Sequence, residues 1–193
     1  MHDIEPYFGW RDHYVATEDT RSPFYSREHS EFYFTQKIYN YYIHPQWDNF
    51  GSNTLYTKVL YANYDEGFVI MEMFGEWNDC LYNDIMTLKR DIIESMSSEG
   101  ISKFILICEN VLNFHASDDC YYEEWAEETA DEGGWVCFLN TLKHVDEEMQ
   151  STKLQHHIFF GGIYNHINWR TKHPDRLFEA IEMAVLRGTN QLR

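Results

Sequence analysis

The chain has 193 residues, of which 44% are hydrophobic, and it carries a formal net charge of −17. Such a negative charge excludes a broad nucleic-acid-binding surface, which would need Lys and Arg to neutralise phosphates, and it disfavours anionic membrane surfaces. The sequence has no run of about 18 apolar residues, so we expect no membrane insertion. The length suits one domain with an extension.

The cysteines show no paired spacing, and two of them fall among apolar residues. This pattern favours reduced, buried thiols over a disulfide framework. The N-terminal residues lack a basic segment followed by an apolar one, so no secretory signal is expected. We therefore predict a cytoplasmic protein.

Residues 1–54 are rich in aromatic side chains and contain three of the four prolines. Within them, residues 29–45 mix rings and β-branched side chains without clean alternation, so strand and helix both remain open. We expect residues 1–54 to form an arm that packs on a domain spanning residues 55–193. Exposed rings in such an arm would favour self-association into a homo-oligomer.

Regular patterning begins at residue 55. Residues 55–62 alternate along the chain as in a half-buried strand, and residues 68–77 predict a second strand after a tight turn. A helix is then predicted to begin at Asn78 or Asp79 and to end at Gly100. Its apolar stripe consists of Leu81, Ile85, Leu88, Ile92 and Met96.

The apolar run at residues 103–108 is typical of a strand covered on both faces. The polar residues after it predict a loop into a helix, with Ser117 as N-cap and Asp118 and Asp119 in the first turn. Residues 118–132 carry eight carboxylates and no Lys or Arg. A solvated helix face is the default interpretation of this run, and a basic protein partner or bound cations would relieve the repulsion among its carboxylates.

Residues 135–149 have the spacing of an amphipathic helix, and the residues from 154 onward resemble a strand that ends at Gly161 and Gly162. Pro174 is well placed as the first residue of a last helix. Strands separated by helices predict an α/β fold with a single open mixed sheet flanked by helices.

From residue 55 onward, this order of elements resembles the STAS domain of anti-sigma-factor antagonists and their SpoIIAA-like relatives. Val111, Phe114 and Ser117 match the family's loop pattern with a one-residue slip, whereas Asp118 stands in place of the family's glycine. The stretch FFGGIYNHINWR resembles a later strand and loop of the SpoIIAA-like branch. The resemblance implies a non-enzymatic regulatory module that binds a protein partner, with Ser117 nearest to the family's phosphorylated serine.

The whole chain is also similar to a family of uncharacterised cytoplasmic proteins of Bacteroidetes, which have comparable GEWND, ENVLNFH and NWR stretches. This similarity indicates a bacterial source and implies no mechanism.

Open α/β sheets place their sites where the strands end, so we expect a ligand-binding or partner-binding site at that edge. Turn formation and helix capping explain the same residue types without a site, and both interpretations remain open. The candidate residues are Glu109, Asn110, Asn113, His115, Ser117, Asp118, Asp119, Glu123, Glu127, His166, Trp169 and Arg170.

A second hypothesis is a small metal-assisted hydrolase that uses His115, Asp118, Asp119 and His166, since imidazole and carboxylate are suitable ligands. Ordinary surface histidines explain these residues as well. The sequence has no HExxH, Walker-A, GxGxxG or GxSxG motif, so we predict neither a catalytic residue nor a cofactor.

Overall fold

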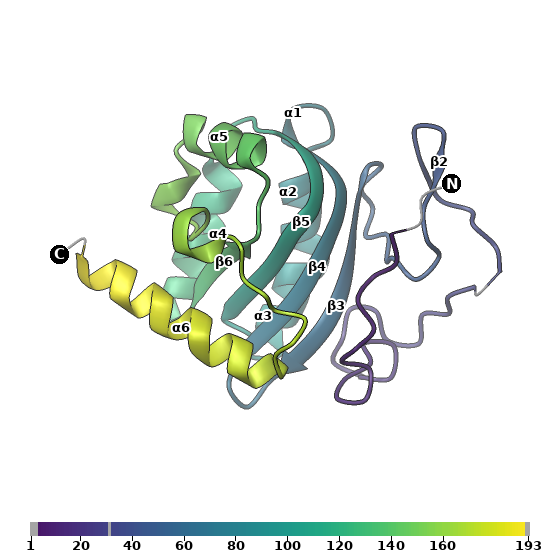
Figure 1. Ribbon diagram of the computed structural model, residues 1–193, viewed down its shortest axis with the longest axis horizontal. Helices are drawn as coiled ribbons and strands as arrows, with labels where there is room; N and C mark the ends of the chain where they lie inside the picture. The colour runs from purple at the N-terminus through teal and green to yellow at the C-terminus, as the bar shows by residue number, and fades with distance from the viewer. Residues whose placement is uncertain (1–3, 31, 192–193) are drawn as a thin grey trace.

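The computed structural model describes residues 4–30 and 32–191. Within these residues the main sheet has four strands in the order β3-β4-β5-β6. β3 pairs with β4 in antiparallel fashion, and the other two pairings are parallel. The predicted single open mixed sheet flanked by helices is confirmed (Figure 1). The strands are β3 (Leu55–Asn63), β4 (Phe68–Asn78), β5 (Lys103–His115) and β6 (Trp135–Leu139).

One face of the sheet is covered by the helical segment after β4 and by the helices that follow β5 and β6. Its core brings Met71 and Leu106 of the sheet together with Leu88 and Trp125 of the helices. The helical elements on this face are α1 (Asp79–Tyr82), α2 (Asp84–Leu88), η1 (Lys89–Ile93), α3 (Glu94–Ser98), α4 (Cys120–Asp131) and α5 (Lys143–Ser151).

The helix predicted for residues 79–100 is interrupted. Asn78 caps α1 by accepting a hydrogen bond from the Leu81 amide, and Asn83 at φ +51° separates α1 from α2. A π-helical turn, η1, then joins α2 to α3. The predicted stripe is wrong at Leu81, which is 74% exposed because α1 is a separate short turn, and the other four stripe residues are buried.

The opposite face of the sheet is covered by α6 (Pro174–Gln191), which begins at the predicted proline. Phe178 of α6 stacks on Phe68 of β4 with ring centroids 4.0 Å apart. Ile105 and Ile107 of β5 belong to the same cluster. Because this cluster involves the first halves of β4 and β5, α6 leaves the carboxyl-terminal halves of these strands to other segments (Figure 1).

Two predicted elements are wrong. Residues 135–139 form strand β6, not the start of a helix, and only α5 has the predicted helical character. All five β6 side chains are buried, so their continuous apolar pattern does not distinguish a strand from a helix. Residues 154–164 contain the short 3-10 turns η2 (Leu154–His156) and η3 (Gly162–Tyr164) and make one isolated bridge, Cys137 to Phe159.

The N-terminal arm packs along β3 (Figure 1). Trp10, Phe24 and Phe50 are buried in the two main clusters, so the arm contributes to both sides of the sheet. A small hairpin of β1 (Lys37–Ile38) and β2 (Tyr41–Tyr42) lies within it. Exposed rings of the arm include Phe32, Tyr33, Tyr39 and Tyr41. Among the described residues, no helix has the length and apolar character needed to cross a membrane.

Candidate functional site

The polar residues after Cys108 belong to strand β5, so the predicted loop is wrong for residues 109–115. β5 pairs with β4 as far as His115, which lies opposite Asn78. Two register shifts give β5 one extra residue each, between Ile107 and Asn110 and between Val111 and Asn113. Residues 116–119 alone form the connection to α4.

Four of the predicted site residues converge on Glu72, a buried glutamate of β4 that is 1% exposed. Asn110 donates a hydrogen bond to Glu72 Oε1 over 3.3 Å. Arg170 forms an ion pair with Glu109, and its Nη2 lies 3.8 Å from Glu72 Oε1. Trp169 Nε1 donates to Glu109 Oε2 over 3.2 Å. We call these five residues the Glu72 network.

The arm contributes two further hydrogen bonds to the Glu72 network through Tyr7. The backbone N–H of Tyr7 donates to Glu72 Oε2 over 2.8 Å, and the Tyr7 hydroxyl donates to the Arg170 carbonyl. Burial raises the pKa of Glu72 to about 7, and the Glu109 charge adds to this effect, while the Tyr7 N–H and the Arg170 charge oppose it. The network therefore connects the arm, the sheet and the segment before α6. Arg170 provides the cation for its two carboxylates.

A second buried glutamate, Glu76, lies four residues after Glu72 on the same face of β4. It is 8% exposed. Asn113 Nδ2 donates to Glu76 Oε1 over 3.1 Å, and the hydroxyl of Tyr39, in the turn of the β1–β2 hairpin, donates to the same oxygen. The predicted residue Asn113 thus faces Glu76, separate from the Glu72 network.

Sequence reasoning missed both glutamates. The signal that could have found them is an acidic residue at positions 72 and 76 of the otherwise apolar segment 68–77. Residues four apart on a strand share a face, and a carboxylate on a buried face needs a partner.

The connection to α4 differs from its prediction. Asp119 occupies the N-cap position, and the Cys120 amide donates to Asp118 Oδ1 over 3.2 Å. The prediction of Ser117 as N-cap is therefore wrong, and Ser117 is exposed. His157 Nε2 lies 3.3 Å from Asp119 Oδ2, which ties this connection to the residues after η2.

The acidic helix α4 has two kinds of carboxylate. Glu124 and Glu128 both pair with Lys89 of η1, at 2.9 Å and 2.8 Å, and the Lys89 side chain is completely buried. Although burial opposes the charge of Lys89, the hydrogen bonds that it donates to Glu128 and Glu124 raise its pKa. Lys89 therefore neutralises part of the repulsion that the sequence assigns to this run. Glu123 and Glu127 remain exposed and form no ion pair with any described residue.

A surface groove runs beside the exposed carboxylates of α4. Glu123 and Glu127 line one wall, and His156 and His157 belong to the other. Val136 and Phe159 also line the groove, as does Trp135, whose ring stacks on Phe178 of α6. The groove thus combines an acidic wall with apolar surface from β6 and the segment after η2.

The predicted metal ligands do not form a cluster. His115 ends β5 and is exposed, and His166 is exposed with a φ of +62°. No hydrogen bond or ion pair joins these histidines to each other or to Asp118 within residues 4–30 and 32–191. In the same part of the chain, no group of three or more His, Cys, Asp or Glu side chains is arranged to hold a metal ion. His156 ends the 3-10 turn η2 and His157 follows it, so neither lies in the predicted strand.

Comparison with solved structures finds a distant structural likeness. The structure of the anti-sigma factor antagonist SpoIIAA in its unphosphorylated form matches with a TM-score of 0.38 and 11% sequence identity, over 55% of this chain and 89% of that one. No family model matches the chain. No curated protein matches it either. The function is therefore argued from the geometry of this chain.

Proposed function

We propose that the protein is a non-enzymatic regulatory module of the cytoplasm that binds a basic segment of a protein partner. The binding surface is the groove between α4 and residues 156–159, together with the connecting residues 117–119. The observation that supports this proposal is the division of carboxylates on α4. Glu124 and Glu128 are neutralised by Lys89, whereas Glu123 and Glu127 face the groove without a cation from the described residues.

The composition of the groove defines the chemistry of the partner. A segment with Lys or Arg side chains would pair with Glu123 and Glu127, and apolar side chains next to them would cover Phe159. Charge complementarity of this kind raises association rates and makes binding sensitive to salt. The four free cysteines of the chain suit the reducing cytoplasm.

A site-specific crosslink tests the proposal. A photoreactive amino acid placed at Ala126, which lines the groove, should capture the partner in cells. The purified partner is then titrated by calorimetry against the full chain at low and high salt. We expect the affinity to fall with salt, and we expect the double variant Glu123→Lys, Glu127→Lys to weaken binding by about tenfold or more.

The matched control is the double variant Asp12→Lys, Glu18→Lys. It makes the same change in net charge at exposed positions of the arm, on the other side of the molecule from α4 (Figure 1). This control should bind the partner as the unmodified chain does. Equal weakening of partner binding by both double variants would mean that net charge alone explains the effect. That result would contradict the proposed groove.

A further inference from the structure

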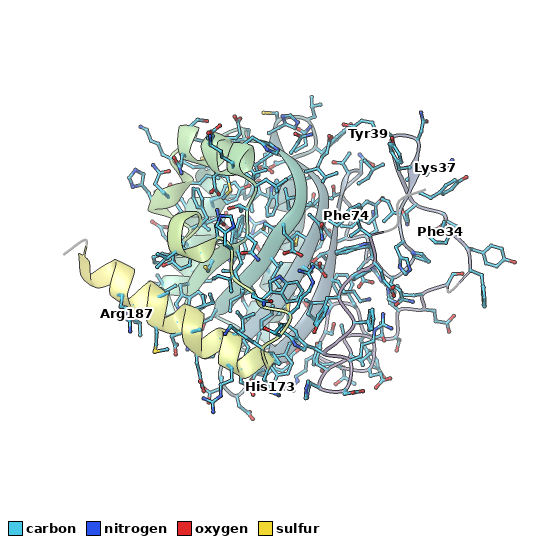
Figure 2. The ribbon with its side chains drawn as sticks, in the orientation of Figure 1. Phe34, Lys37, Tyr39, Phe74, His173 and Arg187 are labelled. Atoms are coloured by element: carbon cyan, nitrogen blue, oxygen red, sulfur yellow. The ribbon has the colours of Figure 1, made fainter. Side chains whose placement is uncertain are left out.

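A pocket adjoins Glu76 on the sheet face opposite α4. It lies between the β1–β2 hairpin and the carboxyl-terminal ends of β4 and β5. Figure 2 shows Tyr39 on the side of the hairpin that faces the strands, with Phe74 nearer the sheet. The residues that line the pocket include Ile38, Tyr39, Tyr41, Phe74, Glu76 and Leu112.

The walls of this pocket are mostly apolar and its mouth is open. Ile38 and Phe74 are buried, and Trp47 stacks on Phe74 with ring centroids 5.1 Å apart. Leu112 and Tyr41 are exposed at the rim. Apolar walls with few polar groups are the usual lining of a small-molecule site.

Glu76 is a charged group among the residues that line the pocket, and no cation of the described residues pairs with it. Both hydrogen bonds to its side chain, from Tyr39 and Asn113, reach Oε1. No ion pair to Glu76 is formed by any side chain in the described part of the chain. Lys37, the cation of the hairpin, instead lies 4.5 Å from the ring centroid of Tyr42. A carboxylate this deeply buried normally has a cationic partner.

We propose that this pocket binds a small primary organic ammonium ion with an aromatic or branched aliphatic body. The ammonium N–H groups donate to Glu76 Oε2, the oxygen that Tyr39 and Asn113 leave open. The rings of Tyr39 and Tyr41 contact the cation, and the body covers Phe74 and Leu112. A quaternary ammonium has no N–H to donate, so it satisfies the carboxylate less well.

The test uses 2-phenylethylamine, with 2-phenylethanol and 3-phenylpropanoate as neutral and anionic analogues. Each is titrated against the full chain by NMR, following amide shifts. The amine should bind saturably, and both analogues should bind about tenfold more weakly or worse, because each leaves the buried carboxylate without a counter-charge. The isosteric variant Glu76→Gln should weaken amine binding by a similar factor.

A matched control lies on the same strand. Glu72→Gln makes the same chemical change at a buried carboxylate whose cation is Arg170, so amine binding should stay within about twofold of that of the unmodified chain. Intermolecular NOEs should connect the ring protons of the amine with the methyl groups of Leu112. This measurement locates the ligand without a variant.

Several outcomes would overturn this site: no saturable binding of the amine, equal binding of the alcohol, equal binding to Glu76→Gln, or NOEs that place the amine elsewhere. The result is independent of the partner groove. The variant Glu123→Lys, Glu127→Lys should leave amine binding unchanged, because α4 covers the other face of the sheet.

Discussion

Glu72 and Glu76 lie four residues apart on the same face of β4, and each is less than a tenth exposed. Around Glu72, the chain supplies Arg170, an asparagine and a backbone N–H from the arm. Around Glu76 it supplies an asparagine and a tyrosine hydroxyl but no described cation. Both carboxylate oxygens of Glu72 accept hydrogen bonds. By contrast, Oε2 of Glu76 accepts none from the described residues, and Glu76 lines a pocket.

The same contrast recurs on α4. Lys89 neutralises Glu124 and Glu128 from beneath, while Glu123 and Glu127 face the groove. Elsewhere the buried Asp48 has Lys58 at 2.9 Å. A carboxylate that the chain pairs with a cation is expected to serve stability, and one that lines a pocket or groove without such a cation is expected to serve binding.

The largest effect should come from Lys89→Met, which removes the cation shared by Glu94 of α3 and by Glu124 and Glu128 of α4, and so leaves these three glutamates near one another. We expect the free energy of unfolding in urea to fall by about 3 kcal/mol, less than for a fully buried network because these glutamates are partly exposed. Lys143→Met is the control, because Lys143 is 91% exposed, and it should cost under about 0.5 kcal/mol. Similar losses for both variants would contradict the idea that carboxylates paired with a cation of the chain serve stability.

Glu72→Gln should change how stability depends on pH. The pKa of Glu72 is raised from 4.5 to about 7, so the folded chain binds this proton more tightly than the unfolded chain does. The carboxyl of Glu72 therefore leaves the free energy of unfolding unaffected below about pH 4.5. It lowers that free energy progressively as the pH rises to about 7, and by a constant amount at higher pH.

In urea unfolding at pH 8, Glu72→Gln should therefore be more stable than the unmodified chain. The shift corresponds to about 3 kcal/mol, and the amide's poorer fit to the donors of Tyr7 and Asn110 reduces the gain to about 2 kcal/mol. Near pH 4 the pH-dependent effect is absent and only the poorer fit remains, so the variant should be less stable there by about 1 kcal/mol. Asp79, whose pKa burial raises to about 6, titrates in both proteins and cancels in the difference. A difference that does not vary with pH would show that Glu72 is not the titrating group.

Glu76→Gln should change stability by less than about 1 kcal/mol at pH 8, because the amide oxygen still accepts from Tyr39 and Asn113 and the NH2 group faces the pocket. Thermal unfolding of the two glutamine variants side by side measures this contrast. A loss for Glu76→Gln as large as the gain for Glu72→Gln would make Glu76 a structural carboxylate.

The smallest effect is expected for Glu123→Lys with Glu127→Lys. These exposed side chains have no cation among the described residues, so unfolding free energy should change by less than about 0.5 kcal/mol. Circular dichroism during urea titration measures it. A loss above that value would mean that these residues hold α4 in place, and weakened partner binding could not then be assigned to direct contacts.

Local signals predicted much of the fold. The β3–β4 hairpin, Asn78 as a cap and Pro174 as a helix start depend on neighbouring residues, and all are found. β6 was missed because a strand buried on both faces has no periodicity of its own. The cap at Asp119 was missed because Ser117 and Asp119 are both good capping residues.

The candidate site was predicted in part. The pair Glu109 and Asn110 does meet the pair Trp169 and Arg170, although about 60 residues separate them in the chain. The first pair lies in the carboxyl-terminal half of β5, and the second pair packs beside it. Their partner Glu72 was not predicted, because an acid within an apolar segment does not reveal which group it faces. Lys89 was missed for the same reason, since its partners come from a helix that begins about 30 residues later.

The π-helical turn η1 accommodates one additional residue in the helical segment after β4. A π turn holds one more residue than an α turn, and Lys89 is its first residue. Leu88 and Met96 belong to the same core cluster although they are eight residues apart, a spacing that a regular α-helix would place about 80° apart around its axis. The wider π turn keeps both of them on the sheet side. Deleting Arg90 would leave them seven residues and about 20° apart on a regular α-helix, so both would still face the sheet. One residue can therefore be lost at this turn without directing the apolar stripe away from the core.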